Sequence, residues 1–228
     1  MDIIKDFVPA HKYGLKCPYS MVPEFFVIHN TSGDASAKNE IAYMKNNNLQ
    51  TSFHFAVDDV EVRQGIPIDR NAFHAGDGVN GKGNRKGIGI EICYSKSGGK
   101  RFEKAEEKAA EFVAERLMKF GWGIDRVKKH QDFSGKYCPH RTLDLGWKRF
   151  LKKVELYMDL LARVEALEKK TDKFIYAWVD DNMPDWAKPT VTKLMDKGIL
   201  QGDEEGKLNL DENMLRMLVI NDRAGLYD

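Results

Sequence analysis

The chain has 228 residues, a length that accommodates one mid-sized domain and something smaller. Hydrophobic residues make up 42% and charged residues 31% of it, which is the composition of an ordinary globular protein. Because 36 basic side chains nearly balance 35 acidic ones, for a net charge of +1, the charge gives no reason to expect nucleic acid or a membrane surface as a partner.

The N-terminal segment 1–10 carries two aspartates and one lysine and has no long apolar core, unlike a secretory signal. We therefore expect synthesis in the cytoplasm without a signal peptide, with any role outside the cell following release by another route. The number of cysteines is small and odd, which argues against a disulfide framework and leaves at least one cysteine free for other chemistry. The cysteines are Cys17, Cys93 and Cys138.

Residues 1–147 mix short apolar runs with loops rich in glycine and asparagine. Apolar or alternating runs predict strands, and spacings of three and four between apolar residues predict helices. Strands interleaved with helices predict an α/β domain, in which a mixed central β-sheet is flanked by helices. The expected strands are 25–29, 52–57 and 87–94, and the expected helices are 34–46 and 103–120, the second ending at Gly121.

Residues 148–173 are dense in charge and leucine and contain neither glycine nor proline, which predicts a single linker helix. Its residues Tyr157, Leu160, Val164 and Leu167 follow the 3-4-3 spacing of a short coiled-coil seam. The alternative is a helix that folds back on the first domain. Residues 174–228 form a compact block that we expect to be a small helical C-terminal domain.

Three residues could ligate a metal. His29 ends a buried strand, while His130 and Cys138 lie eight apart in a loop that can fold back on itself. Catalytic zinc sites use three protein ligands and keep a fourth position for water. Spacing alone leaves an alternative open, in which a structural histidine and a buried apolar cysteine do no chemistry.

Six short segments of the sequence, taken together, indicate a protein family more specifically than any one of them does alone. They resemble, in order, the motifs of the type 2 zinc-dependent N-acetylmuramoyl-L-alanine amidase family, which includes phage lysins and peptidoglycan recognition proteins. The resemblance covers residues 20–147 and implies that 1–147 is a zinc amidase catalytic domain. The segments are Val-Ile-His-Asn-Thr (27–31), Ser-Phe-His-Phe (52–55), Ala-Phe-His-Ala-Gly (72–76), Gly-Ile-Gly-Ile-Glu (87–91), His-Gln-Asp (130–132) and Lys-Tyr-Cys-Pro (136–139).

The resemblance implies a reaction, a metal and its ligands. The reaction is hydrolysis of the amide between N-acetylmuramic acid and the L-alanine of the peptidoglycan stem peptide, by zinc-activated water. The implied zinc ligands are His29, His130 and Cys138. Members that only recognise peptidoglycan typically lack a zinc ligand at the cysteine position, so Cys138 favours an enzyme over a receptor.

The resemblance also implies roles for residues near the metal. Glu91, whose strand neighbours Ile90 and Ile92 face the other way, is expected to be the general base; the alternative is a carboxylate that orients a metal-binding histidine. Lys136 is expected to stabilise the oxyanion, or else to be a solvated loop lysine. The residues expected to contact substrate are His74, Asn30 and Phe53, the last standing where some relatives have a tyrosine.

Residues 177–218 resemble one S-layer homology repeat, on elements that include Trp186, Gly198, Gly202 and Arg216. Such repeats bind cell-wall polysaccharide, and three usually pack into one unit. The resemblance implies that 174–228 is a wall-binding domain, and it suggests that residues 148–228 join copies of the chain into a homo-oligomer.

The expected function is therefore that of a lysin that acts on the cell wall after its release. The alternatives are a bacterial autolysin, a muropeptide-recycling amidase and a non-catalytic peptidoglycan-binding protein. A wall-directed C-terminal domain disfavours recycling, because soluble fragments need no anchor.

Overall fold

The computed structural model describes residues 1–172 and 175–228, so Lys173, the last residue of the expected linker helix, lies outside the described residues, as does residue 174. The chain divides into two compact units, Met1–Leu161 and Ala162–Asp228, which we call unit 1 and unit 2. Among the described helices, none is both long enough and apolar enough to cross a membrane.

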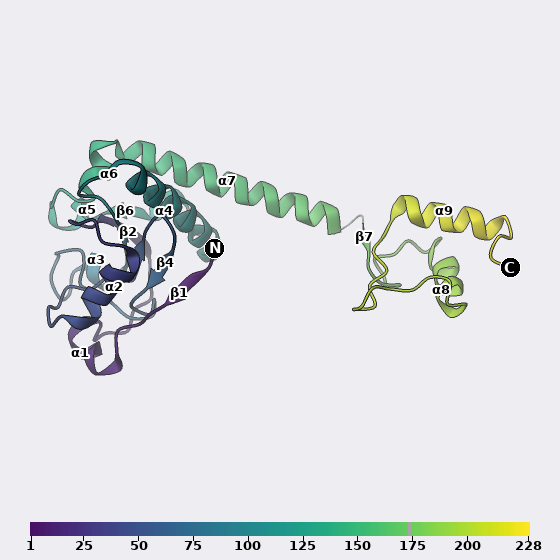
Figure 1. The fold of residues 1–228 in the computed structure, drawn as a ribbon, viewed down its shortest axis with the longest axis horizontal. Coiled ribbons are helices and arrows are strands. Elements are labelled where there is room, and N and C mark those ends of the chain that lie inside the picture. Colours follow the sequence, from purple (N-terminus) through teal and green to yellow (C-terminus); the bar gives the residue numbers. More distant parts are fainter. Residues whose placement is uncertain (173–174) are drawn as a thin grey trace. The chain divides into compact units, whose positions relative to one another are not determined.

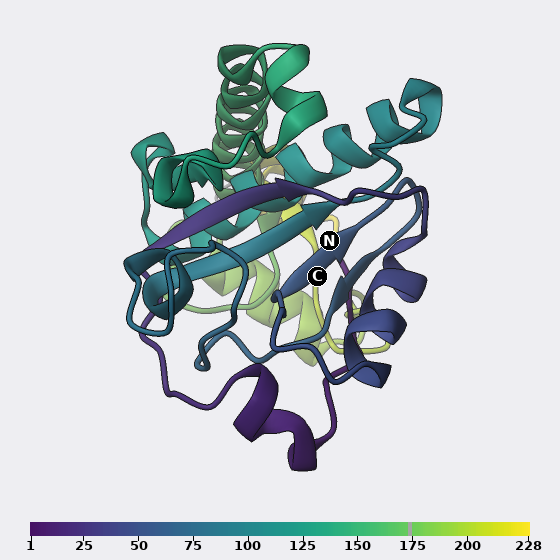
Figure 2. The same ribbon diagram turned by 90° about the vertical axis from the view of Figure 1, so that its left-hand side faces the viewer.

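Unit 1 is built on a sheet whose strand order, over the described residues, is β1-β4-β3-β5-β2-β6. Neighbouring strands are parallel except for the antiparallel pair β3–β4. Figure 2 shows these strands side by side, with helices around them. This confirms the predicted α/β class with a mixed sheet. The strands are β1 (Ile3–Lys5), β2 (Phe25–Asn30), β3 (Phe55–Val57), β4 (Val62–Gln64), β5 (Gly87–Ile92) and β6 (Val127–Lys129).

The predicted strand 52–57 is shorter in the structure, because β3 begins only at Phe55. The backbone N–H of Ser52 donates to the carbonyl of Phe73 and its hydroxyl donates to the carbonyl of Lys16, at 3.0 and 2.6 Å. These bonds tie Ser52 to α1 (Tyr13–Lys16) and to the loop that contains Phe73, and only from His54, whose N–H donates to the carbonyl of Gly89 at 3.0 Å, does the chain bond the neighbouring strand β5.

The helices predicted at 34–46 and 103–120 are both present, as α2 and α4. The hydroxyl of Ser36 accepts from the backbone N–H of Asn39 and so caps α2, and Gly121 ends α4 in the left-handed conformation at φ 66°. The helices are α1 (Tyr13–Lys16), α2 (Ala37–Asn46), α3 (Lys82–Lys86), α4 (Gly99–Phe120), α5 (Gln131–Ser134), α6 (His140–Asp144) and α7 (Trp147–Asp172), of which α7 continues into unit 2, with 3-10 turns η1 (Ala10–Lys12) and η2 (Ile124–Arg126).

The two faces of the sheet have different chemistry, because successive side chains of a strand point to opposite sides. Ile28 of β2 and Ile90 of β5 are fully buried in the main apolar core, to which Phe112 of α4 also belongs. Their neighbours His29 and Glu91 therefore lie on the other face. A helix-covered apolar face thus holds rigid the strands that carry polar residues on the opposite side.

The first half of α7 packs against α4, and the two helices lie side by side in Figure 1. Phe150 and Val154 are fully buried in the core of unit 1. The carboxylate of Glu106, which is 1% exposed, pairs with Arg149 at 2.6 Å and with Lys153 at 3.4 Å. Unit 1 accordingly runs past the boundary expected at residue 147 and includes half of the expected linker.

Unit 2 has an apolar core of its own. After the end of α7, unit 2 contains a two-stranded sheet, β7 (Ile175–Tyr176) with β8 (Leu210–Asp211), and the helices α8 (Lys188–Asp196) and α9 (Glu212–Arg223). A small C-terminal part with helices is therefore present, as predicted. The buried core side chains are Met183, Ala187, Val191, Leu208, Leu210, Leu215 and Val219.

The packing of α7 gives a stability prediction. We expect Phe150→Ala to lower the free energy of unfolding of unit 1 by about 3–5 kcal/mol, because it empties a fully buried aromatic site. Leu156→Ala is the matched control: Leu156 lies on the same helix but is 65% exposed, so its loss should cost less than about 0.5 kcal/mol. Urea denaturation measures both, and equal effects would contradict the packing of α7 on unit 1.

Candidate metal centre

Parallel pairing of strands brings two of the predicted ligands together. Ile28 of β2 pairs with Lys129 of β6, so the next residues along each strand, His29 and His130, are neighbours at the same edge of the sheet. The backbone N–H of His130 also donates to the carbonyl of Ile28 at 3.2 Å. These histidines, 101 positions apart in the sequence, thereby gain a fixed separation.

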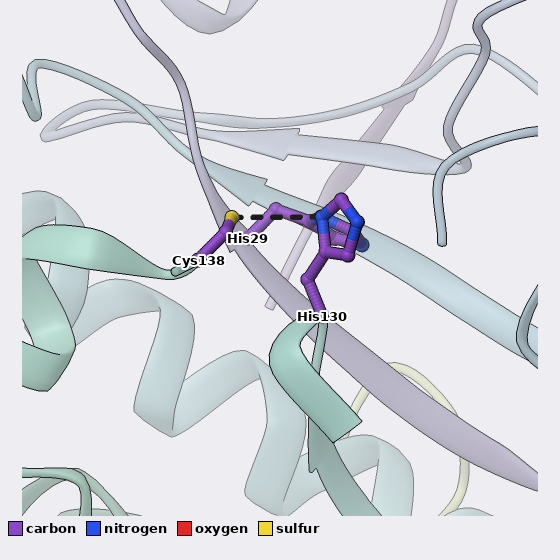
Figure 3. Close-up of side chains that lie close together, drawn as sticks. All are labelled: His29, His130 and Cys138. Atoms are coloured by element: carbon purple, nitrogen blue, oxygen red, sulfur yellow. Dashed lines mark hydrogen bonds between the residues drawn. The ribbon is translucent and has the colours of Figure 1, made fainter. Parts of the chain in front are cut away.

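The third predicted ligand reaches this edge through a closed loop. The backbone N–H of Gln131 donates to the carbonyl of Cys138 at 2.9 Å, which folds the loop back onto its start. Figure 3 shows the thiol of Cys138 directed towards the imidazoles of His29 and His130. All three side chains are buried.

The donor atoms lie at separations that suit one small cation. The Nδ1 atoms of His29 and His130 are 3.0 Å apart, and the Sγ atom of Cys138 is 3.9 Å from Nδ1 of His29. One ligand atom from each residue lies within 4.8 Å of the other two. In tetrahedral zinc sites, such nitrogen pairs lie about 3.3 Å apart and nitrogen–sulfur pairs about 3.6 Å apart. Two imidazoles and a thiolate are also a donor set that zinc prefers, so the residues fit this metal.

His74 fixes the tautomer of His29. Nε2 of His74 is 3.1 Å from the carbonyl of Gly87, and Nδ1 of His74 is 3.0 Å from Nε2 of His29. Since a carbonyl only accepts, His74 donates through Nε2 and accepts at Nδ1, so His29 donates through Nε2. The lone pair of His29 Nδ1 is then directed at the other two donors. A hydrogen bond of this kind orients metal-binding histidines in many sites.

Gly89 makes this arrangement possible. A Cβ atom at Gly89 would lie 2.7 Å from Cγ of His74, so any side chain there would displace the imidazole. His54 also contacts this strand: its Nδ1 accepts from the N–H of Gly89, and its Nε2 donates to the carbonyl of Arg70, both at 2.9 Å. Both ring nitrogens of His54 are therefore hydrogen-bonded to the backbone, which agrees with a structural role for this residue.

Burial keeps the histidines neutral and the thiol protonated in the protein without metal. Burial lowers the pKa of His130 to about 4, with Lys136 contributing, and it lowers the pKa of His29 well below its ordinary value. Burial, with Glu91 contributing, raises the pKa of Cys138 to about 11. Neutral imidazoles are ready to ligate, whereas the thiol must lose its proton on binding a cation.

Glu91 lies directly beside His29, since the two residues pair in the β2–β5 register. Its Oε2 atom is buried and, among the described residues, has no hydrogen-bond partner. Burial, with Glu40 contributing, raises the pKa of Glu91 to about 8. An unpaired buried carboxylate beside metal ligands is costly to keep unless a bound group or a reaction uses it.

The predicted residues line one cleft of about 280 Å³. Asn30 and Phe53 form part of its wall, but the amide of Asn30 is also bonded to Thr142 of α6: it accepts from the N–H of Thr142 at 3.0 Å and donates to its hydroxyl at 3.2 Å. The lining residues that the sequence analysis predicted are His29, Asn30, Phe53, His74, Glu91, His130, Lys136 and Cys138.

The sequence analysis missed one wall of the cleft, which α2 provides. Glu40, Tyr43 and Asn47 line it, together with Leu49 and Thr51 of the following loop. The signal was present, because positions 40, 43 and 47 have the i, i+3, i+7 spacing of one helix face. Met44 of the same helix also lines the cleft, and Ile41 is buried in the apolar core.

Comparison with known proteins agrees with this geometry. A family model described as N-acetylmuramoyl-L-alanine amidase matches residues 19–141. The chain belongs to this family. Over 176 residues this amidase-family chain is 56% identical to N-acetylmuramoyl-L-alanine amidase CwlA of Bacillus subtilis (strain 168), covering 74% of this chain and 65% of that protein.

Two further relatives support the assignment. N-acetylmuramoyl-L-alanine amidase XlyB of Bacillus subtilis (strain 168) is 61% identical over 152 residues, which cover 66% of this chain and 48% of that protein. The solved structure of PlyL matches with a TM-score of 0.66 and 52% identity, over 68% of this chain and 97% of that one. The amidase-family chain thus spans about half to two thirds of the length of these curated relatives.

The protonation state of Cys138 gives a prediction about metal binding. Because its pKa is raised to about 11, the thiol is protonated at pH 7 and must release its proton when it ligates zinc. We expect calorimetric titration with zinc, in buffers of different ionisation enthalpy, to show release of about one proton, and the affinity to rise roughly tenfold per pH unit below that pKa. The Cys138→Ser protein should bind zinc more weakly and release almost no protons. Equal proton release by both proteins would contradict this ligand set.

Proposed function

We propose that the chain hydrolyses the amide bond between N-acetylmuramic acid and the L-alanine of the stem peptide, with zinc as cofactor. The observation that carries the proposal is the convergence of two imidazoles and a thiol beside an unpaired carboxylate, inside one open cleft. Membership of the amidase family supports the same reaction. Zinc held by His29, His130 and Cys138 would supply Lewis acidity and lower the pKa of a water molecule.

The residues of the chain itself would handle protons and charge. The carboxylate of Glu91 takes a proton from the attacking water and delivers it to the departing amine of L-alanine as the amide bond breaks. The ammonium of Lys136, an exposed residue at the rim of the cleft, stabilises the negative charge that develops on the carbonyl oxygen. His74 holds His29 in the required tautomer, so we assign it a positioning role in addition to its place in the cleft wall.

An enzyme is favoured over a binding protein because Cys138 completes the ligand set. Its thiol is buried and faces the histidines, which a peptide-recognition cleft would not require. A lysin or an autolysin that acts on the wall fits these features equally well, since both cut the same bond.

A variant of Glu91 tests the proposed reaction. Glu91→Gln should slow the release of new N-terminal alanine from purified walls about 100-fold or more, because it removes the base while keeping the shape of the side chain. Its zinc content should equal that of the wild type. Glu103→Gln, an exposed residue outside the cleft, is the matched control and should leave the rate unchanged. Chelation should abolish the wild-type activity, and zinc should restore it; alanine release that Glu91→Gln does not slow would refute the assignment.

We further propose that residues 174–228 bind cell-wall polysaccharide and that copies of the chain associate through 148–228. The separate core of unit 2 supports an independent module. The turn of unit 2 that contains Gly202 and Gly206 is tight, since a Cβ atom at Gly202 would lie 2.3 Å from the backbone of Gly206. Leu160 and Val164 of the α7 seam are 47% and 43% exposed, a pattern that suits association with a second helix. Bringing several copies together would rebuild a multi-repeat unit and raise avidity.

Two measurements test this arrangement. Deletion of 174–228 should weaken sedimentation with purified walls while leaving zinc content unchanged. Sedimentation equilibrium at micromolar concentration should show a species larger than the monomer, which Val164→Asp shifts towards the monomer and Leu156→Asp, an exposed change off the seam, does not. A strictly monomeric wild type would exclude association.

A further inference from the structure

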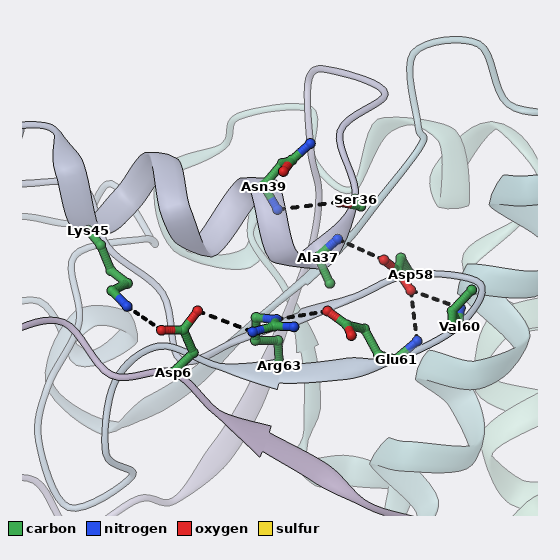
Figure 4. Close-up of polar contacts among 9 residues, drawn as sticks. All are labelled: Asp6, Ser36, Ala37, Asn39, Lys45, Asp58, Val60, Glu61 and Arg63. Carbon is green, nitrogen blue, oxygen red and sulfur yellow. Dashed lines mark hydrogen bonds and ion pairs between the residues drawn. The ribbon is translucent and has the colours of Figure 1, made fainter.

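The wall of the cleft formed by α2 is anchored at the start of the helix. A carboxylate oxygen of Asp58 accepts from the backbone N–H of Ala37, the first residue of α2, at 2.9 Å. The other oxygen accepts from the N–H groups of Val60 and Glu61, both at 2.8 Å. Figure 4 shows these bonds together with the Ser36 cap. The first turn of the helix is thus fixed to the turn between β3 and β4.

The end of α2 is anchored by charge. Lys45 pairs with Asp6, which also pairs with Arg63 at 3.2 Å, and Arg63 bonds Glu61 at 2.7 Å (Figure 4). This chain of alternating charges links α2 to β4 and to the residue after β1. The helix is therefore held at both ends, which fixes its backbone relative to β4 and the turn between β3 and β4.

Two lysines hold the loop that continues this wall. Lys16, which is fully buried, donates to the side-chain oxygen of Asn47 at 2.8 Å, to the carbonyl of Thr51 at 3.1 Å and to the carbonyl of Leu49. Lys12 donates to the carbonyl of Asn47 at 3.0 Å. A buried ammonium needs such partners, and here they shape the rim of the cleft.

One charged group on this wall lacks a protein partner. Glu40 is half-buried and lines the cleft beside Tyr43, yet none of the hydrogen bonds or ion pairs between described residues involves its carboxylate. Lys136 is the one cationic side chain among the described lining residues, and its charge acts on Glu91 and the metal ligands. A half-buried carboxylate without a counter-ion is suited to take a cation from the substrate.

We propose that Glu40 is a specificity residue that binds an ammonium group on the stem peptide. This inference rests on the proposed function. Stem peptides carry a diamino acid, and its side-chain amine is the cation that such a peptide offers. Lysine and diaminopimelate share this chemistry. The rigid α2 wall presents the carboxylate at a fixed place, so an amine at the matching distance along the peptide gains a charge-assisted hydrogen bond that an acetylated amine cannot make.

The test compares substrates that differ in one charge. Muramoyl tripeptides with L-lysine or meso-diaminopimelate at the third position are prepared with the side-chain amine free or acetylated. We expect the wild type to cleave the free-amine form with a kcat/KM roughly tenfold higher. Glu40→Gln should lose this preference, so that the free-amine and acetylated forms are cleaved with equal kcat/KM. Glu103→Gln, an exposed change outside the cleft, should keep the preference.

Binding provides a readout that does not depend on cleavage. Calorimetry with the Glu91→Gln protein should show tighter binding of the free-amine peptide than of the acetylated peptide. Adding Glu40→Gln to this protein should abolish that difference. If Glu40→Gln abolishes the preference only for the lysine peptides or only for the diaminopimelate peptides, that result identifies which diamino acid supplies the amine. A wild type without preference, or Glu40→Gln that slows both forms equally, would overturn the inference. If neither peptide is cleaved, the proposed function fails, while the binding ratio still decides the part played by Glu40.

Discussion

The parallel pairing of β2 with its neighbours β5 and β6 is the constraint on which the site depends. Register in a sheet is fixed by which face is buried, because a slip of one residue would turn every side chain to the other side. Here the isoleucines Ile28 and Ile90 must face the core under α4, so His29 and Glu91 must face the cleft. Apolar burial on one face thereby sets the positions of the proposed catalytic groups on the other.

The polar face then depends on a succession of bonds that begins at the backbone. The carbonyl of Gly87 accepts from His74, His74 accepts from His29, and His29 directs its lone pair to the other proposed metal donors. Each link is short and buried, so the tautomer of one ring determines that of the next. The absence of a side chain at Gly89 leaves room for the imidazole of His74.

Around this centre, the protein uses charge mainly to hold elements in place. Glu106 is buried and paired with two cations that attach α7 to unit 1, and Lys16 is buried among carbonyls at the rim of the cleft. Glu40 and Glu91 differ from these, because no protein cation pairs with either of them in the part of the chain that the structure describes. The contrast separates carboxylates that serve the fold from those available to a substrate or a metal.

The sequence by itself determined the α/β class and two helices of unit 1, α2 and α4, because strand and helix periodicities are local. It also indicated the three proposed metal donors, His29, His130 and Cys138, because each lies within a short motif. Tertiary structure alone decided the rest. The part of His74 in orienting His29, the α2 wall with Glu40, and the attachment of α7 through Phe150 all depend on contacts between residues far apart in the chain. Local patterns carry no information about which distant backbone or side chain such a residue will meet.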